Sequence, residues 1–149
     1  QRGPALRVRA LRFLPAAEAL SQAEDLAGTL QAKERFGALL ALHAHTVRAA
    51  LSEGDTRTAV KAARAALALF DEGYAPDAMY LPAAHLLASQ ALTRAGEADP
   101  AAAAVRAGTD WIRRRALPQV PAPFLDSFLH RNAVNRELLA AASQAQAGC

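Results

Sequence analysis

The chain has 149 residues and a formal net charge of +3, and 52% of its residues are hydrophobic while only 5% are aromatic. This length suffices for one domain with its own core. Few aromatic residues and abundant alanine argue against a β-sandwich or barrel. The small net charge excludes a strong nucleic-acid footprint unless it is focused on one face.

The cysteine content and the hydropathy pattern indicate in which cellular compartment the protein is expected. Cys149 is the single cysteine, so neither a disulfide framework nor a cysteine-based zinc site is expected. No apolar run reaches the ~18 residues that a membrane span requires. The N-terminus carries no recognisable signal peptide. We therefore expect a cytoplasmic protein without a membrane anchor.

Glycine and proline divide the first half of the chain into segments with helical periodicity. The predicted helices cover residues 5–14, 15–30 and 31–53. Gly54 then follows as a left-handed C-terminal cap. Either Asp55 or Thr56 can cap the next helix, whose apolar stripe is mostly alanine. Such an alanine flank allows two helix backbones to approach closely.

The second half of the chain continues in the same way. A helix begins at residue 76 or 81 and ends before Gly96. Asp99 followed by Pro100 predicts the N-cap and first turn of the next helix, which ends in the arginine run 113–115.

Prolines at 118, 121 and 123 interrupt the chain again. A short helix over 123–131 and a last helix over 133–146, capped by Asn132, complete the pattern. The sequence thus predicts an all-α fold of seven or eight helices without strands.

The helices contain an internal repeat. A shift of 42 residues superimposes His43 on His85 and Gly54 on Gly96. In both copies a helix ends at glycine followed by an acid, and the next helix begins with small residues. We expect repeat hairpins at about 33–72 and 77–116, with C-terminal capping helices at 123–146, in a single domain over 1–149. Because one hairpin cannot bury its apolar face alone, neighbouring hairpins should stack around a continuous core.

The first hairpin resembles a tetratricopeptide repeat. The matching residues are Gly54 and Asp55 at the turn, Ala59, and the pair Ala66 and Leu67. The second copy keeps Gly96, Glu97 and Ala101 but has no Ala-Leu pair, and its spacing is longer than the ~34 residues of the family. This resemblance implies a tetratricopeptide-like superhelix of stacked antiparallel hairpins.

The end of the chain resembles a different sequence pattern. It is similar to a "VP…F…SFL.RNPVNR.LL" ending of large bacterial ATPase regulators, in which helical repeats follow a nucleotide-binding domain. The matching residues are Val120, Pro121, Phe124, Ser127 to Leu129, Arg131, Asn132, Val134 to Arg136, Leu138 and Leu139, with Ala133 in place of the usual proline. The resemblance implies the C-terminal part of a bacterial signalling or transcriptional regulator.

The sequence offers no convincing catalytic or metal-binding motif. His43 and His45 are two residues apart on a helix and therefore point in different directions, so they cannot share a metal ion. Ser127 and His130 lack the surroundings of a nucleophile elbow, and no phosphate-binding glycine loop is present. We expect no enzymatic activity, no cofactor and no metal. His43 and His85 should instead pack inside the repeats with their polar edges hydrogen-bonded.

The resemblance to tetratricopeptide repeats implies ligand contacts on the first helix of each hairpin. The corresponding polar residues are Arg48, Ser52, Gln90 and Arg94. They suit a protein or peptide partner or a neighbouring domain of a larger chain. An ordinary solvated helix face is the other interpretation.

Other partners are possible on the same fold. A small-molecule-sensing cleft is the alternative function. Weak nucleic-acid binding through Arg113, Arg114 and Arg115 is a third, although these residues also complement the helix dipole. The exposed ends of the array could pair two copies of the chain.

Overall fold

The computed structural model describes residues 7–8, 10–32, 36–71 and 80–147, and within these ranges it contains helices and turns but no strand. The α-helices are α2 (Ala16–Ala32), α3 (Phe36–Glu53), α4 (Thr56–Asp71), α5 (Leu81–Arg94), α6 (Ala98–Trp111) and α7 (Ala133–Ala147). The predicted all-α class is confirmed. No helix in the described part is both long enough and apolar enough to cross a membrane. Cys149 and the proposed hairpin limits at 33, 72 and 77 lie outside the described residues.

Short elements stand where the prolines and arginines interrupt the helical pattern. A 3-10 turn, η1 (Leu11–Phe13), precedes α2, and the π-helical turn η2 (Ile112–Ala116) continues α6. The segment before α7 consists of η3 (Leu117–Gln119), η4 (Ala122–Phe124) and the π-helical turn η5 (Ser127–Arg131). The arginine run therefore lies in η2, and the short helix predicted over 123–131 is divided between η4 and η5.

The two predicted glycine turns have the same geometry. Gly54 has a φ of 76° and Gly96 a φ of 78°, as expected for left-handed C-terminal caps. The N–H of Asp55 donates to the carbonyl of Ala50 at 2.8 Å, and that of Glu97 donates to Leu92 at 2.9 Å. The repeat detected in the sequence thus recurs as a repeated helix–turn–helix connection.

The structure shows which of the predicted N-caps of α4, α6 and α7 are formed. The N–H of Thr58 donates to Oδ1 of Asp55 at 3.1 Å, so Asp55 caps α4. The N–H of Asn135 donates to Oδ1 of Asn132 at 3.1 Å, which confirms the predicted cap of α7. The predicted cap of α6 is wrong.

The residue before α6 is Glu97, and Asp99 lies in the first turn, where its charge still complements the helix dipole. Glu97 makes no side-chain cap because its carboxylate pairs with Arg64 of α4. One other boundary differs from the prediction: residues 31–32 belong to α2, and α3 begins at Phe36. Of the two predicted starts of α5, the structure has the one at Leu81.

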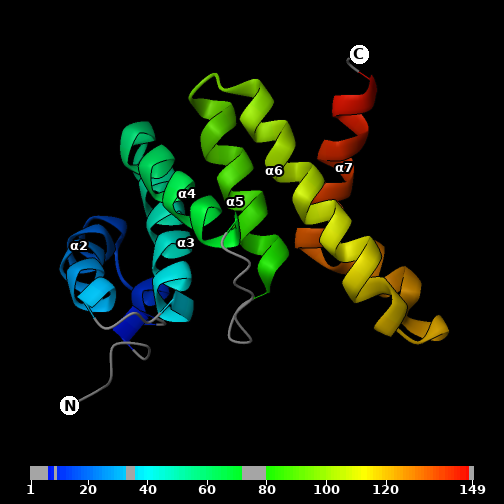
Figure 1. The fold of residues 1–149 in the computed structure, drawn as a ribbon, viewed down its shortest axis with the longest axis horizontal. Coiled ribbons are helices and arrows are strands. Elements are labelled where there is room, and N and C mark those ends of the chain that lie inside the picture. Colours follow the sequence, from blue (N-terminus) through cyan, green and yellow to red (C-terminus); the bar gives the residue numbers. More distant parts are fainter. Residues whose placement is uncertain (1–6, 9, 33–35, 72–79, 148–149) are drawn as a thin grey trace.

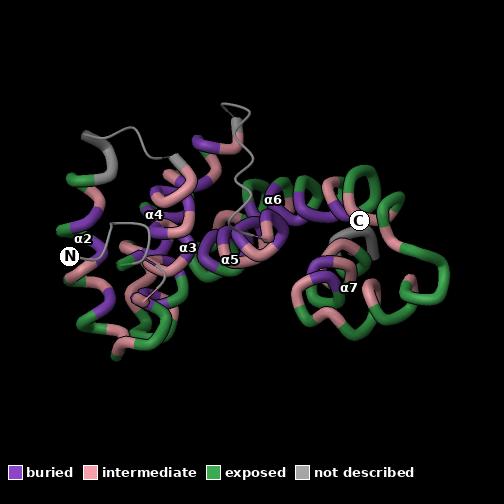
Figure 2. Tube along the Cα trace, turned by 90° about the horizontal axis from the view of Figure 1, so that it is seen from below, coloured by how far each residue is buried: buried purple, intermediate pink, exposed green. Residues whose placement is uncertain are grey.

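The helices form an open row with α2 at one end and α7 at the other (Figure 1). Consecutive helices pack against one another, and α5 in addition contacts both α3 and α7. Buried residues lie where the helices face each other, whereas the segment between α6 and α7 is largely exposed (Figure 2). The helices that precede the glycine turns, α3 and α5, therefore share one side of the row with α7.

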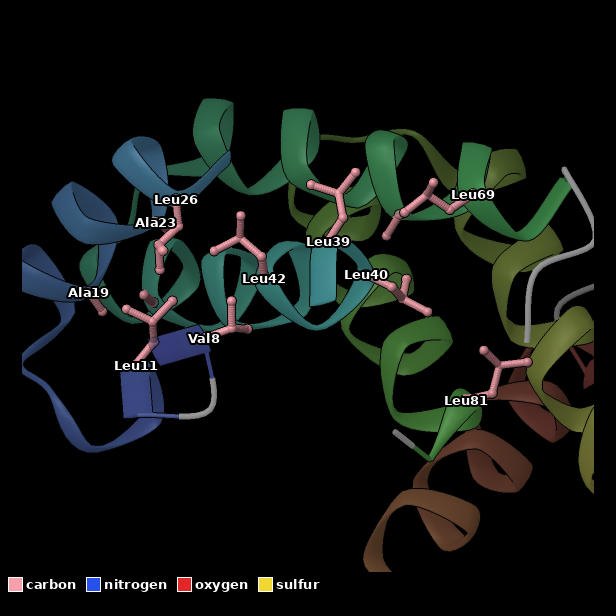
Figure 3. Close-up of a cluster of buried hydrophobic side chains, with 12 residues drawn as sticks. Val8, Leu11, Ala19, Ala23, Leu26, Leu39, Leu40, Leu42, Leu69 and Leu81 are labelled. Atoms are coloured by element: carbon pink, nitrogen blue, oxygen red, sulfur yellow. The ribbon is translucent and has the colours of Figure 1, made fainter. Parts of the chain in front are cut away.

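Buried side chains form three clusters along this row. The first joins η1 and α2 to α3 through leucines such as Leu11, Leu26 and Leu42 (Figure 3). The third joins α6 to α7 through Val105, Ile112 and Leu138. The half-buried Trp111 packs against both of these clusters.

The middle cluster is almost entirely alanine. Its buried members are Val47, Ala50, Ala59, Ala62, Ala63, Ala88, Ala91 and Ala104, from α3, α4, α5 and α6. With side chains this small, the helix backbones approach closely, as the alanine stripe predicted.

A glycine on α6 also allows close packing of neighbouring helices. A Cβ added at Gly108 would lie 3.1 Å from Cβ of His85 and 3.1 Å from a methyl carbon of Leu138.

Replacing Ala63 by leucine should destabilise the protein. Ala63 is 0% exposed within the alanine cluster, so the additional methyl groups have no space without displacing a helix. Overpacking of this kind costs about 1–3 kcal/mol. The free energy of unfolding from urea titration measures the effect. Ala103→Leu, at an exposed position of α6, is the control, and an equal stability of the two variants would contradict the tight packing.

Candidate functional site

The four residues selected from the sequence line a single groove. Arg48 and Ser52 lie one turn apart on α3, while Gln90 and Arg94 lie one turn apart on α5. The groove has a volume of about 950 Å³ and also takes residues from α6 and α7. The direct contact between α3 and α5 brings together residues that are about 40 positions apart in the sequence.

The floor of the groove is apolar and its far wall is polar. Leu51, Leu86, Leu87, Ala101, Ala102, Val105 and Ala141 supply apolar surface. Glu137 and Gln144 of α7 line the wall opposite α3. The groove thus has arginines on its α3 and α5 side and a carboxylate on its α7 side.

The sequence predicts α7 as a capping helix, and its contribution to the groove differs from that prediction. Glu137, Ala141 and Gln144 follow the i, i+4, i+7 spacing of one helix face. That spacing was visible in the sequence. What it could not show is that α7 packs beside α5 and so presents this face to the groove.

Arg94 has a structural partner as well as a place in the groove. Its Nη1 donates a hydrogen bond to the carbonyl oxygen of Leu51 at 2.8 Å. Leu51 lies in the last turn of α3, and its carbonyl also accepts a hydrogen bond from the N–H of Gly54 at 3.2 Å. Arg94 therefore links α5 to the end of α3, so its removal would affect the groove wall as well as any ligand contact.

Arg48 lies against a neighbouring histidine. Its Nη1 is 3.4 Å from Nδ1 of His45, one turn earlier on α3. Because a guanidinium can only donate, Nδ1 accepts and the imidazole carries its proton on Nε2. Burial, and then the charges of Arg48 and Arg12, lower the pKa of His45. Arg48 itself is exposed and has no carboxylate partner among the described residues.

His85 is buried against an aromatic ring. His85 is 5% exposed and stacks on Phe70 with a ring separation of 4.3 Å. Its buried Nδ1 has no hydrogen-bond partner among the described residues, so the expected hydrogen-bonded polar edge is wrong at this atom. Within the described ranges, no three histidine, cysteine or acidic side chains gather closely enough to hold a metal ion.

The structure thus defines an all-α chain with a long groove along one side. Comparison with protein-family models, with curated proteins and with solved structures finds no match to this chain.

Proposed function

We propose that the chain is a non-enzymatic module of the tetratricopeptide-like superhelix type that binds another protein or a neighbouring domain. Its place would be the C-terminal scaffold or sensor part of a bacterial signalling or transcriptional regulator. The repeated glycine turns and the open row of paired helices support the first statement. The resemblance of residues 120–139 to the ending of bacterial ATPase regulators supports the second.

One observation carries the binding proposal. Arg48, Ser52, Gln90 and Arg94 were selected by their positions in two repeats, and all four line the same groove. If these four residues were only parts of ordinary solvated helix faces, they would not need to line one cavity between α3, α5 and α7.

The groove chemistry specifies the occupant. Two arginines on one side favour carboxylates, since guanidinium groups form charge-assisted hydrogen bonds with them. The leucine and valine floor favours apolar side chains. The occupant is therefore a peptide segment with acidic residues toward Arg48 and apolar residues over Leu86 and Leu87.

Peptide binding should depend on Arg48 and Gln90. We expect short acidic peptides with apolar residues to bind more tightly than their neutral counterparts in a fluorescence polarisation array. Arg48→Gln should weaken binding about tenfold or more, because a hydrogen bond to a charged group contributes about 1.5–3 kcal/mol. Gln90→Ala should weaken it to a smaller extent.

The control is Arg106→Gln, an exposed arginine of α6 that does not line the groove. Arg94 is left intact because it also supports the end of α3. Equal affinities of the Arg48 and Arg106 variants would contradict peptide binding in the groove.

A small molecule is the second candidate for the same groove. Its volume of about 950 Å³ falls within the range of ligand pockets, which is roughly 300–1,000 Å³. A metabolite that raises the melting temperature of the wild type but not of Arg48→Gln, together with no peptide binding, would favour this function.

A further inference from the structure

A second, smaller pocket lies at the other side of Arg48. It has a volume of about 180 Å³. The pocket is lined from three elements: Arg12 from η1, Ala16 and Ala19 from α2, and His45, Arg48 and Ser52 from α3. It shares Arg48 and Ser52 with the large groove.

The polar groups of this pocket are all suited to an anion. Arg12 and Arg48 each carry a permanent positive charge, and Ser52 offers a hydroxyl donor. The imidazole of His45 accepts from Arg48 at Nδ1 and is therefore a donor at Nε2. None of the described residues that line the pocket carries a carboxylate.

Arg12 and Arg48 have no carboxylate partner among the described residues. Both line the pocket together with His45, and the charge of each lowers the pKa of its imidazole. The guanidinium of Arg12 also lies over the ring of the exposed Phe13, at 4.6 Å from the ring centroid. Two like charges that converge on one partly buried imidazole repel each other, and a bound anion would relieve that repulsion.

The fold adds a further positive contribution. Ala16 is both a lining residue and the first residue of α2, a helix of 17 residues. The positive end of the α2 dipole therefore lies at the pocket wall. Glu18, the acid in the first turn of α2, is exposed and accepts a hydrogen bond from Gln22.

We propose that the pocket formed by Arg12, His45, Arg48 and Ser52 is a binding site for a phosphate group. Bidentate guanidinium donors match the oxygens of a phosphate, and Arg12 and Arg48 both line this pocket. The phosphate can be a free inorganic ion or a phosphorylated side chain on a peptide in the adjoining groove. The site does not depend on peptide binding, because Arg12 lies outside the groove.

Titration with inorganic phosphate tests the site directly. At a constant ionic strength set with KCl, phosphate should raise the melting temperature saturably. Arg12→Gln and Arg48→Gln should each weaken the apparent phosphate affinity about tenfold or more, while Arg106→Gln should leave it unchanged. Because Arg12 and Phe13 are both exposed, Arg12→Gln keeps the fold and carries the test if Arg48→Gln is destabilised.

A second measurement separates this proposal from the groove. A phosphorylated peptide that binds more tightly than its unphosphorylated form, with the gain lost in Arg12→Gln, identifies a phosphopeptide as the source. Free phosphate binding without such a gain identifies the inorganic ion. Gln90→Ala should weaken peptide binding but leave phosphate binding intact. A phosphate response equal to that of KCl, or one unchanged by Arg12→Gln, would overturn the phosphate site whatever the peptide results.

Discussion

Acidification from pH 6.5 to pH 4 should lower the free energy of unfolding by up to about 3 kcal/mol through His85 alone. Burial lowers the pKa of His85 to about 4, whereas an unfolded histidine titrates near ~6.5. Between these values the unfolded chain binds a proton that the folded chain excludes. The contribution of His85 to stability is therefore present above pH 6.5 and is lost as the pH falls toward 4.

Denaturant titrations of His85→Leu at several pH values test this expectation. Leucine has a similar volume and no titrating group, so the variant should show a clearly smaller loss of stability below pH 6.5. It should be at least as stable as the wild type at pH 7, because the unpartnered Nδ1 is removed from the core. His130→Leu, at an exposed histidine, is the control. A pH dependence identical to that of the wild type would show that His85 is not excluded from protonation by burial.

Replacing Asn135 by leucine should cost about 2–4 kcal/mol. Asn135 is 0% exposed, and its side chain links α7 to η5 and to Tyr80, the residue before α5. Its Nδ2 donates to the carbonyl of Phe128 at 3.0 Å, and its Oδ1 accepts from the hydroxyl of Tyr80 at 2.6 Å. The substitution leaves two part-buried polar groups without a partner, each at a cost of about 1–3 kcal/mol.

The measurement is again the free energy of unfolding, now in a double-mutant cycle with Tyr80→Phe. The double variant should lose less than the sum of the single losses, because both remove the same hydrogen bond. Asn132→Ala, which removes only the cap of α7, should cost about 1 kcal/mol. If Asn135→Leu also lowered the free energy of unfolding by only about 1 kcal/mol, as expected for loss of the cap, the hydrogen bonds of the Asn135 side chain would contribute little.

Local signals in the sequence accounted for much of the helical framework. Gly54 and Gly96 required a backbone conformation that other residues rarely adopt, so both turns could be located. Asn132 capped the helix predicted for it. Asp99 did not cap α6, because the helix already begins at Ala98, directly after the glycine turn, and the carbonyl of Glu97 accepts from the N–H of Ala101 at 3.1 Å. Such a shift depends on the geometry of the preceding turn, which no single residue type determines.

The candidate site was predictable where it follows the repeat and not where it depends on contacts between distant segments. Arg48 and Gln90, which were selected by their repeat positions, line one groove. The bond from Arg94 to Leu51 spans 43 residues, and the pocket with Arg12 requires η1 to pack beside α3. Neither contact has a local pattern. The same holds for His85, whose burial against Phe70 requires α4 and α5 to meet.

Gly108 has a consequence for the spacing of the helices that line the groove. It lies at the junction of three helices, where the methyl group of an alanine would come within 3.1 Å of both His85 on α5 and Leu138 on α7. A side chain at residue 108 would displace α5 and α7 from α6. The spacing of these helices therefore depends on the absence of a Cβ atom at this position. The width of the groove between α5 and α7 can thus be altered at a residue that does not line it.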